Sequence, residues 1–329
     1  MEQSNKLYPL KFVPVEREHE WGKESFLLAD LAEVGTMVRS GWLGSNSVSE
    51  LMETYLEDIV GEASFNYYGL QFPVTVRVLD VEGRMPLVVT TDDRTAAARY
   101  DAFGKSVFWY VAETSPKAEI RVGFEDDRDA SSLIAACEKG NLSSMLRRFK
   151  PSKGDCFEIR PGLVHGASGK MKIIEISEAS DLDFQVADSD GFTGEHLAEA
   201  LDLIDYSAGK ALPVQRSEKD GVALLADIPE FKVSELRLDA PVRIEGGPRG
   251  TFSVYYCLSG GIVVKAVDGS SKSEEGLSDT AVRKGELVLV PAGLGDFLLA
   301  PSAEDTFLLE VIAGNREEPD SYLLDEQKK

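Results

Sequence analysis

The chain has 329 residues, 43% of them hydrophobic, which is enough to bury either one large core or two of ordinary size. Its formal net charge is −22, from 57 acidic and 35 basic residues. Because this charge repels phosphate backbones and anionic membrane surfaces at long range, we expect neither a nucleic acid nor a membrane as a partner.

The first two thirds of the sequence mix helix-like and strand-like segments. Helices are expected where apolar side chains recur at helical spacing, as in LMETYLEDIV, and strands where β-branched and aromatic residues cluster, as in FPVTVRVLDV. The predicted helices are 51–60, one or two within 131–149 around a break at Gly140 and Asn141, and 195–206. The predicted strands are 72–81, 106–112 and 172–177.

From residue 231 onward the sequence predicts only short strands, which Gly, Pro and Ser separate. This rhythm is typical of a small antiparallel barrel. The predicted strands are 252–258, 261–267, 287–290, 297–300 and 307–312. The stretch after residue 206, including the polar segment 216–221, is typical of a linker. We therefore predict two domains, 1–206 and 207–329, with the boundary between Ser207 and Lys232.

One short pattern occurs twice with identical spacing, in Gly154–His165 and in Gly285–Asp296. Each copy has a glycine and an acid, a buried strand, a glycine at a tight turn and a polar residue aimed inward. These hairpins resemble those of cupins, small barrels in which the last position carries a metal-binding histidine. The resemblance implies a mostly β fold with helical insertions, a tandem cupin (bicupin) of two double-stranded β-helix barrels. Only the first copy keeps the histidine.

The cysteines and the N-terminus bear on the cellular compartment. Cys137, Cys156 and Cys257 are odd in number and far apart, which favours reducing surroundings over a disulfide framework. The segment 1–10 lacks an apolar signal core, and no apolar run approaches the ~20 residues that span a bilayer. We expect a cytoplasmic protein.

Five segments follow one another in an informative order: PLKFVPVEREHEWGKESF, FPVTVRVLDV, GKSVFWY, MLRR and GDCFEIRPGLVHG. Together they resemble type I mannose-6-phosphate isomerases, which are zinc-dependent cupin enzymes that interconvert mannose 6-phosphate and fructose 6-phosphate. The similarity covers roughly the first two thirds of the chain, and the second barrel matches only as a fold pattern. The order of the motifs carries the resemblance, because no single motif is specific.

The resemblance implies that most metal-ligand positions are substituted. Thr90 stands where the family has its first metal histidine, Val107 where it has a glutamate, and Val88 where relatives often have a glutamine. Only His165 is retained. A catalytic zinc ion needs about three N, S or O ligands, and valine supplies none. Gln185 also replaces an arginine thought to aid catalysis.

We therefore expect no cofactor, or zinc if the chain is an active isomerase. His19 and His196 match no ligand position. Asp92, Asp93 or Glu175 could complete a carboxylate–histidine site with His165 only after a rearrangement of the site.

Several residues of the family's sugar pocket have counterparts here. The predicted substrate-binding residues are Lys105, His165, Glu175, Asp181 and Trp21. The resemblance implies that Lys105 contacts sugar oxygens, although a solvated turn lysine is an open alternative. Trp21 has a flat apolar face that could stack on a sugar ring, whereas we expect Trp109 to be a core residue.

A basic run, Arg147, Arg148 and Lys150, could receive a phosphate group. It could equally complement the C-terminal dipole of a preceding helix. In the second barrel, Asp296 replaces the histidine, so we expect this barrel to be structural and to pack on the first barrel or on a second subunit.

Three functions remain open. The first is a degenerate relative of the isomerases that binds a sugar or sugar phosphate without zinc or isomerase activity. The second is an active isomerase with a rebuilt site, using either a shifted metal or Lys105, Glu175 and Asp181 in metal-free proton transfer. The third is an assembly protein, such as a homo-oligomeric scaffold. We favour the first.

Overall fold

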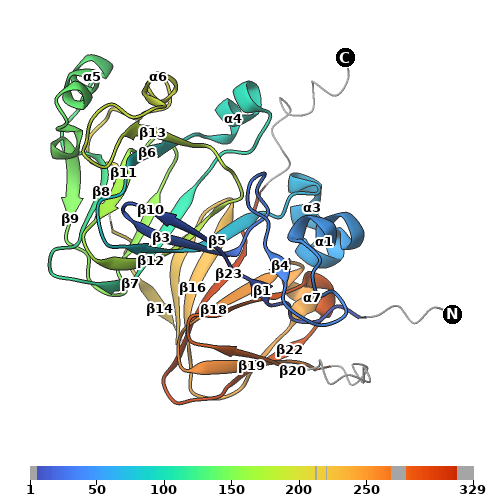
Figure 1. The fold of residues 1–329 in the computed structure, drawn as a ribbon. Helices are drawn as coiled ribbons and strands as arrows, with labels where there is room; N and C mark the ends of the chain where they lie inside the picture. Colours follow the sequence, from blue (N-terminus) through green and yellow to red (C-terminus); the bar gives the residue numbers. More distant parts are fainter. Residues whose placement is uncertain (1–5, 212, 220, 268–278, 317–329) are drawn as a thin grey trace, which may run out of the picture. The chain divides into compact units, whose positions relative to one another are not determined.

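A computed structural model describes residues 6–211, 213–219, 221–267 and 279–316 of the chain (Figure 1). These residues form two compact units. The N-terminal unit contains Val15–Phe26 and Thr75–Val214. The C-terminal unit contains the described residues up to Pro14, the segment Leu27–Val74 and the described residues from Gln215 onward. This grouping differs from a single cut after residue 206, because residues 27–74 group with the C-terminal strands.

Two β-sheets make up most of the N-terminal unit. The six-stranded sheet has the order β10 (Cys156–Ile159), β7 (Val107–Thr114), β12 (Met171–Glu178), β5 (Val74–Val81), β3 (Gly22–Leu28) and β2 (Val15–His19). The five-stranded sheet has the order β13 (Asp183–Ala187), β6 (Leu87–Thr90), β11 (His165–Ser168), β8 (Glu119–Phe124) and β9 (Leu146–Phe149). The pairs of β7 with β10 and with β12 are antiparallel.

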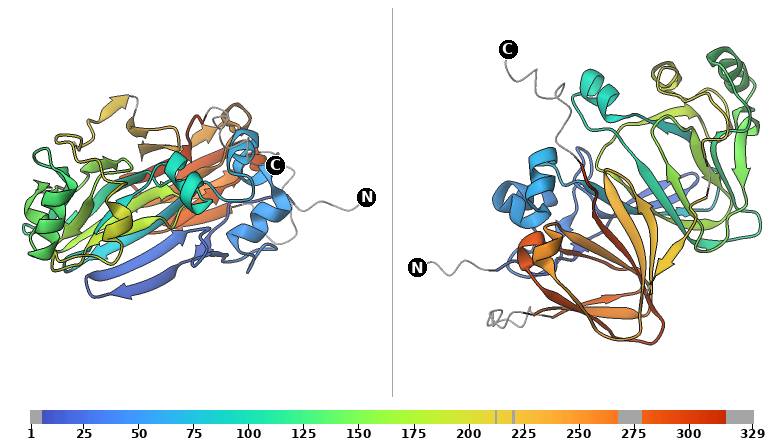
Figure 2. Two further views of the ribbon diagram at one scale, coloured as in Figure 1. Left: turned by 90° about the horizontal axis from the view of Figure 1, so that it is seen from above. Right: turned by 180° about the vertical axis from the view of Figure 1, so that it is seen from behind.

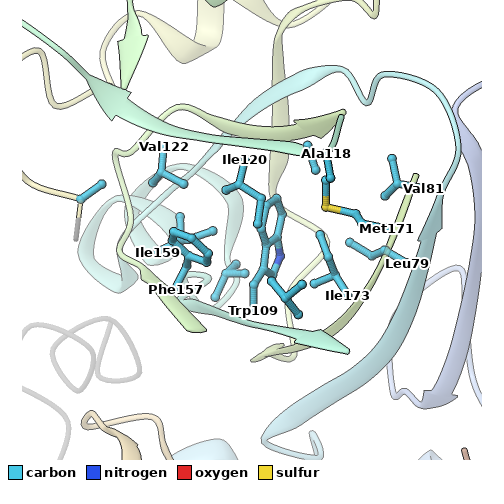
Figure 3. Close-up of a cluster of buried hydrophobic side chains, with 14 of the residues drawn as sticks. Leu79, Val81, Trp109, Ala118, Ile120, Val122, Phe157, Ile159, Met171 and Ile173 are labelled. Atoms are coloured by element: carbon cyan, nitrogen blue, oxygen red, sulfur yellow. The ribbon is translucent and has the colours of Figure 1, made fainter. Parts of the chain in front are cut away.

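An apolar core fills the space between these two sheets (Figure 3). Because side chains alternate across a strand, the register places Trp109 beside Phe157 of β10, and Val111 beside Ile173 of β12, on one face. Ile120 of β8 reaches the same cluster from the five-stranded sheet. Burying each large apolar side chain stabilises the fold by about 1.5–3 kcal/mol.

Helices cover the outer face of the five-stranded sheet (Figures 1 and 2). Leu87 and Val89 of β6 point to this face and pack with residues of α5 (Ala130–Glu138) and α6 (Leu197–Ala200). The alternate residues of β6, Val88 and Thr90, therefore face the interior of the unit.

The helix predictions need correction. Of the helical segment predicted over 131–149, α5 ends at Glu138, before the predicted break at Gly140 and Asn141, and after the short 3₁₀ turn Leu142–Ser144 the chain forms β9 instead of helix. The reason is strand pairing, since Leu146 lies opposite Phe124 of β8. The helix predicted over 195–206 is only the single turn α6. A further helix, α4 (Asp93–Tyr100), is capped by Asp92 and has no counterpart in the sequence prediction.

The helix predicted over 51–60 is a chain of three short helices, α1 (Val48–Tyr55), α2 (Glu57–Val60) and α3 (Glu62–Tyr68). Ser47 caps α1 in a capping box with Glu50. The break falls at Leu56, whose φ of 49° is outside the right-handed helical region.

The C-terminal unit also contains two larger sheets. The six-stranded sheet has the order β14 (Ser217–Lys219), β15 (Val222–Asp227), β16 (Phe231–Leu238), β23 (Thr306–Ala313), β18 (Ser253–Ser259) and β21 (Leu287–Val290). The four-stranded sheet has the order β17 (Val242–Ile244), β22 (Phe297–Pro301), β19 (Gly261–Ala266) and β20 (Asp279–Arg283). The remaining elements are β1 (Phe12–Val13), which pairs with β4 (Met37–Val38), α7 (Gly246–Arg249) and the 3₁₀ turn Ala292–Leu294. The predicted linker 216–221 is partly wrong, because β14 pairs with β15.

The mostly β fold with helical insertions is confirmed. The repeated hairpin is present in both units, with β10 followed by β11 in one and β21 followed by β22 in the other. All three cysteines are buried as thiols. Among the described residues, the helices are too short or too polar to cross a membrane.

Candidate functional site

Polar side chains gather at one end of the interior of the N-terminal unit, beside the apolar core. On β6, Val88 and Thr90 face inward, and on the neighbouring β13 they lie opposite Gln185 and Asp183. On the other side of β6, His165 of β11 lies opposite Val88. The register therefore brings these five residues to the inner face of the five-stranded sheet.

The six-stranded sheet contributes a buried glutamate. Glu175 of β12 lies opposite Trp109 of β7, and its Oε2 accepts a hydrogen bond from Trp109 Nε1 at 2.8 Å. Its Oε1 accepts from Nε of Arg77 on β5 at 2.8 Å. Arg77 Nη1 also pairs with Glu24 of β3 at 2.9 Å, and His19 Nε2 contacts the other oxygen of Glu24 at 2.9 Å.

Lys105 lies in the segment that precedes β7, and its side chain approaches Asp183. Gly104 allows this approach, because a Cβ there would lie 2.6 Å from backbone atoms of Asp92 and Asp93. The Lys105 N–H donates to Thr91 O at 2.9 Å. These contacts hold the Lys105 ammonium 2.5 Å from Oδ2 of Asp183.

We refer to Lys105, Asp183, Arg77, Glu175 and Glu24 as the ion network. Arg77 Nη2 lies 3.9 Å from Asp183 Oδ2 and so joins its two halves. Lys105 and Glu175 are only 3% and 2% exposed, whereas the Asp183 side chain is 29% exposed. Solvent therefore reaches the ion network from the side of Asp183.

The opposite charges of the ion network stabilise each other's ionised forms. Burial opposes ionisation of Glu175 and Asp183, but Arg77 and Lys105 outweigh it and lower the pKa of both carboxyl groups. Burial likewise opposes the charge of Arg77, yet the surrounding carboxylates raise its pKa. Both carboxylates are therefore ionised at neutral pH and are weak proton acceptors.

His165 is buried beside the ion network. Its Nδ1 lies 2.9 Å from the carbonyl oxygen of Leu163, and since a carbonyl only accepts, Nδ1 carries the proton and Nε2 is an acceptor. Burial lowers the pKa of His165 despite the nearby carboxylates of Asp183 and Glu175. The ring packs edge-on against Trp109, with centroids 5.4 Å apart. His165 is therefore a neutral hydrogen-bond acceptor at pH 7.

The donor set around His165 does not fit a three-ligand zinc site. Thr90 and Val107, for which the resemblance implies ligand positions in the family, are both buried, and Thr90 Oγ1 has no hydrogen-bond partner among the described residues. The Asp92 carboxylate caps α4 by accepting a hydrogen bond from Thr95 N, and the Asp93 carboxylate accepts a hydrogen bond from Gly104 N. Within the described part of the chain, His165 belongs to no group of three His, Cys, Asp or Glu side chains whose ligand atoms lie within 4.8 Å.

The structure brings together three of the five residues predicted to bind substrate, namely Lys105, His165 and Glu175. Asp181 is exposed and lies outside the ion network, where Asp183 takes the place expected for it. Trp21 lies in the turn between β2 and β3, where it stacks on His19 at 4.7 Å and joins the apolar core. The substrate-binding roles of these five residues stay predictions.

Sequence reasoning missed Arg77 and Glu24. The signal for Arg77 is its position in FPVTVRVLDV, where Thr75, Arg77, Leu79 and Val81 alternate with the residues of the other face. Leu79 and Val81 belong to the apolar core, so the same face carries a charge into the interior.

The C-terminal unit contains a matching arrangement. Tyr255 of β18 lies opposite Glu310 of β23, and its hydroxyl donates to Glu310 Oε1 at 2.8 Å. Arg249 Nη1 contacts the same oxygen at 2.5 Å. At the position of the hairpin histidine, Asp296 instead pairs with Arg243 at 2.6 Å. The repeat therefore includes a buried glutamate held by an aromatic donor and an arginine.

Comparisons with known proteins agree with this architecture. A mannose-6-phosphate isomerase of Bacillus subtilis is 23% identical over 322 residues, which cover 90% of this chain and 97% of that protein. The solved mannose 6-phosphate isomerase from Bacillus subtilis superposes with a TM-score of 0.77 at 20% identity, covering 93% of this chain and 99% of the other. A mutant of phosphomannose isomerase from Salmonella typhimurium gives a TM-score of 0.73 at 11% identity, with 93% and 100% covered. No model of a protein family matches the chain. The chain is therefore similar in sequence to proteins named mannose-6-phosphate isomerases, and it shares the fold of the solved structures.

Proposed function

We propose that the chain binds a sugar or sugar phosphate beside the ion network, without zinc and without mannose-6-phosphate isomerase activity. The observation that carries this proposal is the Lys105–Asp183 ion pair next to His165, in an interior where Thr90 and Val107 occupy the family's ligand positions. Positive charge at this place comes from Lys105 and Arg77, and both cations already neutralise the carboxylates that a metal would need.

The hydrogen-bonding groups suit a sugar. Sugar hydroxyls both donate and accept, and here they meet acceptors on Asp183 and His165 Nε2 and a donor in the Lys105 ammonium. The buried hydroxyl of Thr90 lacks a partner among the described residues, and a bound hydroxyl would supply one. Ligand entry follows the partly exposed side of Asp183.

The same geometry argues against catalysis. Aldose–ketose isomerisation needs a base near C1 and C2 and a positive group that stabilises the developing oxyanion. Glu175 is fixed by Trp109 and Arg77, and its lowered pKa makes it a weak base. The alternative of metal-free isomerisation also required Asp181, which is exposed and outside the ion network.

The test combines metal analysis, calorimetry and an activity assay on the full chain. We expect less than stoichiometric zinc after purification without chelator, and saturable binding of mannose, which carries no anionic group, by chelator-treated protein. Asp183→Asn should weaken that binding at least tenfold, whereas the matched control Asp181→Asn, two residues away and exposed, should not change it. Stoichiometric zinc with isomerase turnover, or equal affinity in both variants, would overturn the proposal.

A further inference from the structure

A hollow lies at the end of β11 away from the ion network, where turns of the N-terminal unit meet. His165 begins β11, and Ser168, which ends it, lines this hollow of about 690 Å³. We call it the turn-end pocket; its lining includes Trp21, Arg84, Lys117, Glu119, Ser168 and Gly169. Its volume is within the usual range for small-molecule sites.

We propose that the turn-end pocket binds the anionic group, a phosphate or a carboxylate, of a small hydroxylated molecule. This site is separate from the ion network and does not depend on the function proposed there.

Two cations of the pocket have no ion-pair partner in the part of the chain that the structure describes. Arg84 and Lys117 are exposed, line the pocket and form no ion pair with any described residue. A guanidinium and an ammonium directed at one anionic group form charge-assisted hydrogen bonds, which are the strong ones. Local positive charge of this kind is needed to bind an anion, because the net charge of −22 repels anions at long range.

Two further arginines add to the positive charge behind the pocket wall. Arg121 Nη2 and Arg148 Nη1 both pair with Glu119, at 2.7 and 3.4 Å, so one carboxylate serves two guanidinium groups. Burial and the nearby charges of Arg84 and Arg148 lower the pKa of Arg121, and its buried Nε has no hydrogen-bond partner among the described residues. A bound anion would relieve this repulsion.

Arg148 belongs to the basic run that the sequence singles out as a phosphate candidate. Arg147 of the same run faces elsewhere, donating to the carbonyl of Ala211 and packing on Phe149. Arg147 and Arg148 lie in β9, beyond the 3₁₀ turn Leu142–Ser144, and are therefore not in the last turn of an α-helix.

Ser168 supplies a neutral donor. Its Oγ accepts from Arg121 Nη1 at 3.2 Å, so the hydroxyl proton remains free to point to a ligand oxygen. The walls are held by backbone contacts, with Gly169 N donating to Gly83 O at 2.7 Å and a bridge between Arg84 and Ser168. A Cβ at Gly169, whose φ is +81°, would lie 2.6 Å from Lys117 O. The pocket is therefore formed before a ligand arrives.

Two acids besides Glu119 set the limit on the ligand's charge. Glu20 and Asp190 also line the pocket, and their carboxylates would repel a second anionic group. They can instead accept hydrogen bonds from hydroxyl groups. The lining therefore favours one anionic group attached to a polyhydroxylated body, such as a sugar phosphate or a sugar acid.

The experiment uses calorimetry on the full chain with orthophosphate, mannose, mannose 6-phosphate and gluconate as probes. Arg84→Gln/Lys117→Gln should weaken binding of the anionic probes at least tenfold and reduce its salt dependence. The control Lys139→Gln/Lys153→Gln removes the same charge from exposed lysines outside the pocket lining and should stay within twofold of the parent.

The Asp183→Asn variant separates this site from the ion network. Charge-dependent binding of mannose 6-phosphate should persist in Asp183→Asn and disappear when Arg84→Gln/Lys117→Gln is added. Binding of mannose 6-phosphate or gluconate but not orthophosphate would show that the hydroxylated body contributes. Unchanged affinity in Arg84→Gln/Lys117→Gln, or no binding of any anionic probe by the parent, would overturn the proposal.

Discussion

The Lys105 ammonium lies 2.5 Å from Oδ2 of Asp183, in the interior of a unit whose relatives are named mannose-6-phosphate isomerases. The Lys105 side chain is 4% exposed and that of Asp183 is 29% exposed. A charge this deeply buried is tolerated because its partner, together with Arg77 and Glu175, completes a compensated set. The ion network therefore holds β13 against the segment before β7, and it also makes this part of the interior polar.

Removing one partner of this pair should be costly. We expect Lys105→Met to lower the free energy of unfolding by about 3–5 kcal/mol, because it leaves the Asp183 carboxylate without its closest cation. The double variant Lys105→Met/Asp183→Leu should recover more than half of that loss. Urea unfolding measures both.

The control for this cycle is Lys170→Met. Lys170 is exposed and lies 3.9 Å from Glu82, so its loss should change stability by less than about 0.5 kcal/mol. A single variant at Lys105 that is as stable as this control would show that the ion pair contributes little.

Stability should fall with acid in two steps. The folded-state pKa of His165 lies below its ordinary value of 6.5, so the unfolded chain takes up a proton first as the pH drops from 6.5. The pKa values of Glu175 and Asp183 are lowered from 4.5 and 3.8, so their stabilising contribution is full above those values and is lost as the pH falls through the folded-state values.

Urea unfolding between pH 8 and pH 3 checks this. His165→Asn, whose side-chain amide can still donate to Leu163 O, should remove the decline that begins near pH 6.5 and keep the one below pH 4.5. Identical pH profiles for the parent and this variant would contradict the assignment of the first step.

The two buried glutamates should respond alike to loss of their aromatic donors. Trp109→Phe and Tyr255→Phe each remove one hydrogen bond to a charged acceptor, Glu175 or Glu310, and should each cost about 1–3 kcal/mol. Burial and the Glu310 carboxylate raise the pKa of Tyr255, so it stays a donor throughout the neutral range. Only Trp109→Phe should also change the affinity for mannose, and an equal effect of Tyr255→Phe on that affinity would place the sugar elsewhere.

The hairpin that carries His165 could be predicted from the sequence because its turn restricts both the residue type and the backbone conformation. Gly162 has a φ of +88°, and its N–H donates to Thr90 O, so the turn requires glycine and fixes where the next strand begins. The spacing from Gly154 to His165 therefore determines which residue opens β11.

The ion network could not be predicted from the sequence, for a different reason. Asp181 and Asp183 are two residues apart and would share one face of an extended strand, so only the observed start of β13 at Asp183 separates them. The strand at 146–149 depends on β8, a partner far away in the sequence, and local periodicity does not report such pairing. Whether the Arg77 side chain points inward is defined only once both sheets of the unit are in place.

Introducing metal ligands beside His165 is the sharpest test of the proposal that this interior lacks a zinc site through substitution of ligand positions. Thr90→His and Val107→Glu should complete a three-ligand set with His165, because Thr90 lies on the inner face of the strand next to His165 and Val107 faces the same interior from β7. Both positions are buried, so without metal the added polar groups should destabilise the fold. Zinc at 1,000 times its dissociation constant should restore about 4 kcal/mol through binding to the folded state alone.

The readouts are zinc stoichiometry, unfolding with and without zinc, and coupled isomerase activity. Adding His165→Ala to the double variant should abolish zinc uptake, which separates a rebuilt site from adventitious binding. Isomerisation of mannose 6-phosphate should remain weak until Gln185→Arg restores a positive charge on the inner face beside Val88, because a metal polarises sugar oxygens but does not replace that charge. Isomerase activity in the parent, or a double variant that is folded by circular dichroism yet takes up no zinc, would contradict this account of the site.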